Sequence, residues 1–250
     1  MKIYNYLLKV ISGKGAAFLV LIDPDKIDCK NFSSFITASS KSGVDAYLVG
    51  GSLMINGNLP VTIKKIKSYC SKPVIIFPGS IEHICREADA LLYISMVSSR
   101  NAEHLIGKHV QAAPIINKFG IEPISTAYML IESGGYTTAE YISGSKPIPR
   151  NKPEIAVATA LASEYLGMKM IYLEAGSGSD ITVPEEMIKM VSDTCTVPVI
   201  VGGGIKDPDT ARNKTKAGAK IVVIGNHFED SGNWKLIEDF SRAIHHKIKR

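Results

Sequence analysis

The 250-residue sequence lacks the features of a disulfide framework, a zinc site or a membrane span. Its four cysteines, Cys29, Cys70, Cys85 and Cys195, form no CxxC pair, and the histidines lack zinc-ligand spacing. We therefore expect buried free thiols in a reducing cytoplasm. No signal peptide opens the chain, and the apolar run AAFLVLI is far shorter than the roughly 20 residues that span a bilayer. A cytoplasmic protein is expected, with any membrane contact peripheral.

The sequence also lacks a nucleic-acid-binding pattern. The net charge is +5 and the pI about 8.9, but basic and aromatic residues do not interleave. Part of the positive excess lies in the final residues HHKIKR, which we expect to form a solvated helix end. A mild attraction for anionic substrates or lipid headgroups fits this charge, and no nucleic-acid partner is expected.

What the sequence does contain is an alternation of short apolar runs and amphipathic segments. The apolar runs are nearly continuous, as in strands buried on both faces of a parallel sheet. They predict strands at 17–22, 46–50, 73–77, 90–96, 123–131, 169–174, 197–201 and 220–224. Helical patterns fall at 30–42, 58–70, 101–111, 153–166, 184–194, 207–217 and 232–248, and VPEEM and DPDTA mark two helix starts. Eight such units predict an α/β fold, a single-domain (β/α)8 TIM barrel over residues 1–250.

Two connections depart from a regular barrel. Only IEHICREAD separates the third and fourth strands, which is short for a barrel helix, so this helix is expected to be reduced or missing. Residues 133–153 form a long segment rich in Gly, Ser, Thr and Pro, without periodicity. A loop of that length inside a compact domain is usually functional or disordered.

Glycines gather where the last two strands end. VGGGIKDPDTA follows the seventh strand, and VIGNHF contains the end of the eighth. Gly202, Gly203 and Gly204 allow a ligand to approach backbone N–H groups, and Gly225 and Asn226 would begin a short helix facing the same point. A tight turn without a ligand is the alternative for GGG alone. The pairing of GGG with IGN favours the phosphate site common at these two loops of a barrel.

A carboxylate precedes the small-residue loop in MIYLEAGSGSD. Tyr172 and Glu174 share one face of the sixth strand, because they are two residues apart. An outward face would bury an unpaired carboxylate beneath the helices at a cost of several kcal/mol, so we place Glu174 at the barrel mouth. An ion pair with a neighbouring Lys or Arg is the alternative.

A second acidic site is expected after the first strand, in LIDPDK. Asp23 closes the strand and Pro24 stops its ladder. A carboxylate at a strand end suits Mg2+, which keeps several waters and binds phosphate oxygens, but spacing alone favours an Asx turn or helix cap, a common role for D-P. Ser52, after the second strand, offers a hydroxyl. Because barrel closure brings the first and eighth strands together, the cation and phosphate sites should be neighbours.

Taken together, FLVLIDPDK, GGS, EYLGMKMIYLEAGSGS, VPVIVGGGI and IVVIGN resemble the geranylgeranylglyceryl phosphate synthase (PcrB-like) family, in its longer-sequence subgroup. Members of that family are modified TIM barrels that lack one barrel helix, in agreement with the short third connection. They join a prenyl diphosphate to the C3 hydroxyl of sn-glycerol 1-phosphate and release diphosphate. The resemblance implies ether phospholipid biosynthesis, with geranylgeranyl diphosphate (C20) as the favoured donor and heptaprenyl diphosphate (C35) as the alternative.

The resemblance also assigns roles to individual residues. Asp23 and Ser52 would contact the Mg2+ cofactor, where the family often has Thr in place of Ser52, and Lys26 would offset charge on the leaving diphosphate. Glu174 would be the general base, with Tyr172 beside it. Glycerol 1-phosphate would be held by Tyr172, Leu173, Glu174, Ala175, Gly176, Ser177, Gly178, Gly203, Gly204, Gly225 and Asn226. A homo-oligomer, either a dimer or a hexamer, is implied as well, together with peripheral membrane contact for the lipid product.

The implied chemistry places two demands on the fold. A carboxylate of ordinary pKa cannot remove an alcohol proton outright, but it can accept the proton as the C–O bond forms. The prenyl tail needs an apolar trough, for which the short third connection would leave a gap in the helix ring.

Three other functions fit parts of the pattern. Phosphosugar isomerases of histidine and tryptophan biosynthesis share the VGGGI loop, but YLEAGSG is not their sixth strand. An aldolase would need a Schiff-base lysine, and Lys169 lies at the wrong end of the sixth strand. A regulatory phosphosugar-binding barrel would require neither Glu174 nor Asp23.

Overall fold

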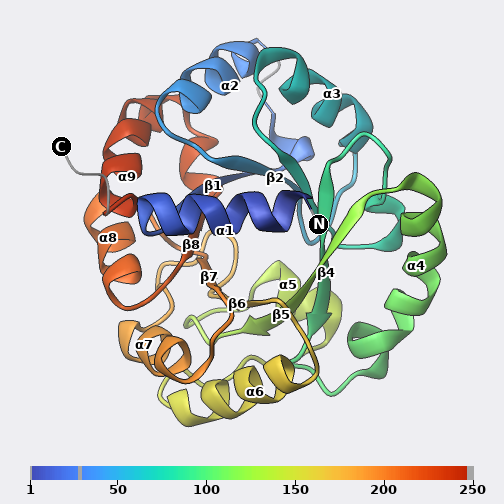
Figure 1. Cartoon of the computed structure of the whole chain (residues 1–250), viewed down its shortest axis with the longest axis vertical. Coiled ribbons are helices and arrows are strands. Elements are labelled where there is room, and N and C mark those ends of the chain that lie inside the picture. Colours follow the sequence, from blue (N-terminus) through green and yellow to red (C-terminus); the bar gives the residue numbers. More distant parts are fainter. Residues whose placement is uncertain (1, 28–29, 247–250) are drawn as a thin grey trace.

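Eight parallel strands close into a barrel in chain order, with β1 pairing with β8 (Figure 1). The computed structural model describes residues 2–27 and 30–246. The strands are β1 (Ala17–Ile22), β2 (Ala46–Gly50), β3 (Val74–Phe77), β4 (Ala90–Met96), β5 (Glu122–Leu130), β6 (Met170–Glu174), β7 (Val199–Gly202) and β8 (Ile221–Ile224). Each of them overlaps a predicted strand, so the predicted TIM barrel is confirmed.

Helices ring the barrel, as Figure 1 shows. They are α1 (Lys2–Lys14), α2 (Phe32–Lys41), α3 (Leu59–Tyr69), α4 (Lys108–Phe119), α5 (Thr138–Ser143), α6 (Pro153–Tyr165), α7 (Glu185–Thr194), α8 (Pro208–Lys216) and α9 (Ile237–Ile244). Short helical turns are η1 (Pro24–Lys26), η2 (Ile81–His83), η3 (Glu103–Gly107), η4 (Asn226–Phe228) and η5 (Ser231–Leu236). The connection between β3 and β4 holds only η2, so the predicted loss of one barrel helix is confirmed.

The strands are apolar on both faces because they separate two cores. Inward side chains such as Leu19, Leu48 and Tyr172 fill the barrel interior. Outward side chains such as Val20 and Leu173 pack beneath the helices. This double burial is why the strands read as continuous apolar runs rather than alternating ones.

Helix α1, which the sequence did not predict, covers the N-terminal end of the barrel (Figure 1). Leu7 is 1% exposed and joins the interior core. The helix lacks an acidic residue in its own first turn. Instead the Glu122 carboxylate, at the start of β5, accepts hydrogen bonds from Ile3 N–H (2.7 Å) and Tyr4 N–H (3.1 Å). The cap therefore comes from a residue more than a hundred positions away, beyond the reach of local sequence signals.

Two further helix predictions need correction. The helix expected at 101–111 instead spans η3 and α4 and ends at Gly120, whose φ of +67° suits a helix C-cap. The 133–153 segment, expected to be irregular, contains α5, capped by the Thr137 hydroxyl accepting from Glu140 N–H.

The expectation of a solvated C-terminal helix end is wrong for His245. Its side chain is buried, with Nε2 2.8 Å from Asp45 Oδ2 at the start of β2. Residues 247–250 lie outside the described residues, as does Cys29. The free thiols of Cys85 and Cys195 are buried as expected, whereas Cys70 is half-buried.

Among residues 2–27 and 30–246, no helix combines the length and the apolar composition needed to cross a membrane.

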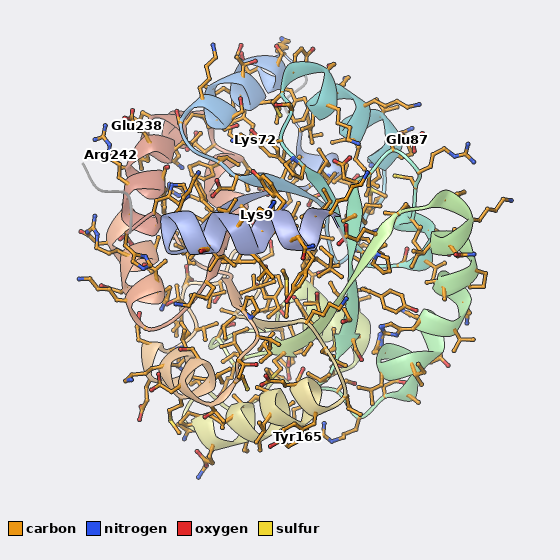
Figure 2. The ribbon with its side chains drawn as sticks, viewed as in Figure 1. Lys9, Lys72, Glu87, Tyr165, Glu238 and Arg242 are labelled. Carbon is orange, nitrogen blue, oxygen red and sulfur yellow. The ribbon has the colours of Figure 1, made fainter. Side chains whose placement is uncertain are left out.

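Shortening Leu7 tests whether α1 is an integral part of the barrel. Leu7→Ala should lower the free energy of unfolding by about 2–5 kcal/mol, because the side chain leaves a cavity in the barrel end. Lys9→Ala is the matched control, since Lys9 is exposed on the same helix (Figure 2) and should stay within about 0.5 kcal/mol of wild type. Urea unfolding measures both variants. A Leu7→Ala midpoint equal to that of Lys9→Ala would show that α1 is only loosely docked.

Candidate active site

A cavity of about 370 Å³ opens at the C-terminal end of the barrel. The loops after β1, β2, β6, β7 and β8 converge on it, as expected for the functional face of this fold. It brings together most of the predicted site residues: Asp23, Lys26, Ser52, Tyr172, Glu174, Gly176, Ser177, Gly178, Gly203, Gly204, Gly225 and Asn226. The sequence therefore selected one contiguous surface from five separate segments.

Leu173 and Ala175 do not line this cavity. Both side chains point into the outer core, and the Ala175 N–H is donated to Gly202 O at 3.1 Å. Neither residue offers the cavity a side chain, so their contact with glycerol phosphate stays a prediction.

Glu174 is the buried acid of the site. It ends β6, opposite Gly202 on β7, and is 7% exposed. Its Oε1 accepts a 2.7 Å hydrogen bond from Gly176 N–H. Burial raises the pKa of Glu174 to about 7, although the Gly176 N–H and the Tyr172 hydroxyl act to lower it. The ordinary pKa assumed from the sequence is therefore too low, and no lysine or arginine of the described chain forms an ion pair with this carboxylate.

Tyr172 lies on the same inward face, one pleat below Glu174. Its ring packs against Tyr128 (centroids 5.2 Å apart) and Phe77 (5.8 Å). The hydroxyl approaches Glu174 closely enough to influence its pKa, yet it forms no hydrogen bond of standard geometry among the described residues. An unsatisfied buried hydroxyl is costly in a stable core and common at functional sites.

The glycines after β7 allow the backbone to approach Glu174. A Cβ on Gly202 would lie 2.4 Å from Tyr172 Oη, and one on Gly203 would lie 2.5 Å from Glu174 Oε1. Gly203 also has a φ of +87°, which L side chains rarely adopt. The GGG motif is thus required by both space and conformation, independently of any ligand.

The loops that follow β6, β7 and β8, called loops 6, 7 and 8, form one wall of the cavity. Ser177 Oγ donates to Asn226 Oδ1 at 2.5 Å, joining loop 6 to the start of η4. Lys206 and His227 also line this wall, and sequence reasoning missed both. Lys206 directly follows VGGGI and His227 directly follows IGN, so each was next to a motif that had been recognised.

The adjoining wall, formed by the loops after β1 and β2, carries the predicted cation and diphosphate residues, because β1 pairs with β8. Asp23 Oδ1 accepts from Asp25 N–H at 3.0 Å, so Asp23 is a helix cap, the alternative left open by the sequence. Lys26 Nζ lies 3.7 Å from Asp23 Oδ2 and 3.2 Å from Glu229 Oε1. Glu229, which the sequence did not single out, therefore shares Lys26 with Asp23.

The donors present suit a magnesium ion that relies on substrate for part of its coordination. Asp23 supplies a carboxylate and Ser52 a hydroxyl on the wall of the same cavity, and both are the hard oxygen donors that Mg2+ prefers. Within the part of the chain that the structure describes, no cluster of three or more His, Cys, Asp or Glu is placed to hold a metal. A cation here would therefore need phosphate oxygens and water to complete its shell.

A second, smaller and largely apolar cavity of about 130 Å³ adjoins the first. It lies beside β3, β4 and α4, where the ring lacks a helix. Ser52, Phe77, Tyr128 and Ala139 line both cavities. Ala139 belongs to α5, so this short helix borders the junction. An apolar cavity is therefore present at the predicted gap, and it shares lining residues with the polar site.

Comparison with known proteins agrees with this geometry. A sequence model described as the PcrB family matches residues 9–245. The chain belongs to the PcrB family.

Relatives of this PcrB-family chain match it over nearly its whole length. The geranylgeranylglyceryl phosphate synthase of Chitinophaga pinensis is 43% identical over 244 residues, covering 98% of this chain and 96% of the relative. That of Methanosphaera stadtmanae is 42% identical over 246 residues, covering 98% and 100%. A crystal structure of the Thermoplasma acidophilum synthase, in complex with its substrate sn-glycerol-1-phosphate, superposes with a TM-score of 0.91 at 32% identity, covering 98% of this chain and 99% of that one.

More distant structures share only the barrel. The tryptophan synthase alpha chain of Legionella pneumophila superposes with a TM-score of 0.60 but is 13% identical to this chain. That similarity shows the fold and carries no argument for a phosphosugar isomerase or any related activity.

Adding one carbon at Gly203 tests the close approach to Glu174. Gly203→Ala should lower turnover by on the order of 10²-fold, because the Cβ would displace the carboxylate or loop 6, and misplacements of about 1 Å have effects of that size. Gly13→Ala is the control, since its Cβ meets nothing within 4 Å. Steady-state rates and unfolding midpoints are measured for both. Wild-type turnover in Gly203→Ala would show that this contact is not needed.

Proposed function

We propose that the chain is a Mg2+-dependent prenyltransferase. It would form an ether bond between the C3 hydroxyl of sn-glycerol 1-phosphate and geranylgeranyl diphosphate, releasing diphosphate for ether phospholipid synthesis. The observation that carries this proposal is that two cavities adjoin: a polar one, in which a carboxylate with a pKa of about 7 faces a glycine-rich wall, and an apolar one that shares four of its lining residues. The names of the relatives and the sn-glycerol-1-phosphate bound to the Thermoplasma protein support the choice of substrates.

The polar cavity explains how the acceptor would be oriented. Its phosphate would lie against loops 6, 7 and 8, where Gly203, Gly204 and Asn226 bring the backbone to the cavity wall. Its C3 hydroxyl would then point toward Glu174. The raised pKa makes Glu174 a stronger base than an exposed glutamate, so it is better matched to take the hydroxyl proton as the C–O bond forms.

The donor would occupy both cavities. Its apolar tail would lie in the trough beside β3 and β4, and its diphosphate would face Asp23 and Lys26. Mg2+, held by Asp23 and Ser52, would stabilise negative charge on the departing diphosphate. Lys26 would add a positive charge there once it leaves Glu229, with which it is paired in the described structure.

The chain length of the donor is proposed from the names of the relatives, which specify geranylgeranyl. Heptaprenyl diphosphate is the alternative. The assay combines the protein, Mg2+, labelled sn-glycerol 1-phosphate and prenyl diphosphates of several lengths. Organic-extractable label that is greatest with the C20 donor supports the proposal. Label greatest with C35 corrects the donor, and no label with any donor rejects the activity.

The same assay tests the cation. Excess chelator should abolish turnover, and added Mg2+ should restore it. The described side chains supply too few oxygen ligands to hold the ion by themselves, so it would bind together with the substrate and a chelator could remove it. Full activity in chelator would remove Asp23 and Ser52 from this role. The predicted homo-oligomer and the predicted peripheral membrane contact are checked separately, by mass in solution and by co-sedimentation with vesicles.

The Glu174 pKa predicts a pH profile. Because the base works only when ionised, turnover should rise with pH and level off above about 7. Glu174→Gln should lower turnover by on the order of 10²–10⁴-fold and remove this rise. A wild-type profile that is flat between pH 5 and 8 would exclude Glu174 as the base.

The same pKa predicts an opposite effect on stability. Since the folded-state pKa lies above the ordinary value of 4.5, the ionised carboxylate destabilises the fold as pH rises through about 7. Glu174→Gln should therefore be more stable than wild type at pH 8, by up to roughly 3 kcal/mol, with little difference near pH 4. Urea unfolding at the two pH values measures this. A variant that is less stable than wild type at pH 8 would contradict the conclusion that burial raises the pKa of Glu174.

A further inference from the structure

We propose that Lys206 is the cation that binds the phosphate group of the acceptor, and that it does so by leaving an ion pair with Asp180. The ligand class is a phosphate monoester or free phosphate, and the link to glycerol phosphate rests on the proposed function. Lys206 is the second residue after the GGG motif, and its side chain lines the same cavity as Gly203, Gly204 and Asn226.

The charges on the cavity wall leave Lys206 as the available partner for a dianion. The charged side chains that line it are Asp23, Lys26, Glu174, Lys206 and Glu229. Lys26 lies between Asp23 and Glu229 on the wall assigned to the diphosphate. On the side of loops 6 and 7, Lys206 is the cation that lines the cavity, and its acidic partner Asp180 is not part of that lining.

The backbone of loop 6 offers less to a phosphate than its glycine content suggests. The Ala175 N–H is donated to Gly202 O, and the Gly176 N–H to Glu174 Oε1. The Ser179 N–H is donated to Gly176 O. Because these three N–H groups are already engaged, a side-chain cation would add to what the remaining backbone offers a phosphate, and a charge-assisted bond from lysine is stronger than one from a neutral amide.

Lys206 also influences the neighbouring wall formed by loop 8. Burial lowers the pKa of His227, Asp230 and Asp207 raise it, and the Lys206 ammonium lowers it further. His227 Nε2 is buried without a hydrogen-bond partner among the described residues. Lys206 on loop 7 is therefore near enough to His227 on loop 8, the residue after Gly225 and Asn226, to affect its pKa.

The pair with Asp180 is of a kind that a ligand can displace. Lys206 Nζ lies 2.7 Å from Asp180 Oδ1, but the side chains are 57% and 91% exposed. Exposed pairs contribute little because water screens both charges. If Lys206 leaves, the Asp180 carboxylate remains in water, so no buried, unpaired charge is left behind.

Loop 6 would keep its position when this pair opens, because a second lysine holds it from beneath. Lys214, on α8, is 0% exposed and donates to Thr182 Oγ1 (2.7 Å), Val183 O (2.6 Å) and Glu185 Oε1 (2.7 Å). Thr182 in turn packs next to Gly204, whose Cβ position lies 3.4 Å from its methyl carbon. Lys206 can therefore change partners without releasing the wall that carries the glycines.

The alternative is that Lys206 and Asp180 form a structural tie between loops 6 and 7. The two explanations predict opposite changes in phosphate affinity when Asp180 is removed. If the pair is a tie, removing either partner should weaken phosphate binding to a similar extent. If Lys206 moves to the phosphate, removing Asp180 should strengthen binding, since the competing acid is gone.

Calorimetry on the full chain, with inorganic phosphate and with sn-glycerol 1-phosphate as probes, separates these cases. Lys206→Met should raise the Kd for both probes about tenfold, and Lys206→Arg should recover most of that loss. Asp180→Asn should lower the Kd by about two- to fivefold. Lys189→Met and Asp193→Asn are the matched controls, because that exposed pair on α7 is also short, at 2.6 Å, and lies outside the cavity.

Several results would overturn the inference. A Kd that rises equally in Lys206→Met and Asp180→Asn would show a structural tie, and an unchanged Kd in Lys206→Met would show that the lysine does not bind phosphate. Urea midpoints confirm that each variant is folded. In the transferase assay, Lys206→Met should raise KM for glycerol phosphate and leave KM for the prenyl diphosphate unchanged.

Failure of the proposed function gives a different outcome. A wild-type protein that binds inorganic phosphate through Lys206 but forms no ether lipid would reject the transferase activity and leave the phosphate site standing. A wild-type protein that forms the ether, with a Lys206→Met variant of unchanged KM for glycerol phosphate, would reject the role of Lys206 alone.

Discussion

The contact between the Glu174 carboxylate and the backbone of Gly202 and Gly203 is the constraint on which the site depends. It requires glycine on β7 and in the following turn, because a Cβ at either position would collide with Glu174 or Tyr172. It also removes water from the carboxylate, which is why its pKa rises to about 7. One steric arrangement therefore sets both the shape of the acceptor wall and the basicity of its acid.

The absence of a full helix between β3 and β4 gives this acid a hydrophobic neighbour. In a regular barrel a helix would cover these strands and leave no room for an apolar cavity beside the polar one. Here an apolar cavity meets the polar one at Phe77, Tyr128, Ser52 and Ala139. The proposed prenyl diphosphate donor depends on this junction, because it has an anionic head and a long apolar tail.

Each of the two walls carries one lysine, which is held in ion pairs and is proposed to bind an anionic group of a substrate. Lys26 is paired with Asp23 and Glu229 on one wall, and Lys206 with Asp180 on the other. Ion pairs of this exposure are easily exchanged for phosphate oxygens, whereas the buried Lys214 keeps its three partners and fixes loop 6.

The sequence by itself determined the barrel and the missing helix, and most of the site residues that it predicted line the cavity. Strands buried on both faces must be apolar throughout, and strand ends of a parallel barrel must meet at one face, so both features are visible locally. Only the tertiary structure decided the rest. Helix α1 is capped by Glu122, His245 is buried against Asp45, and Glu174 has a raised pKa because β7 covers it. Each of these depends on a residue distant in the chain, and no local pattern records such a contact.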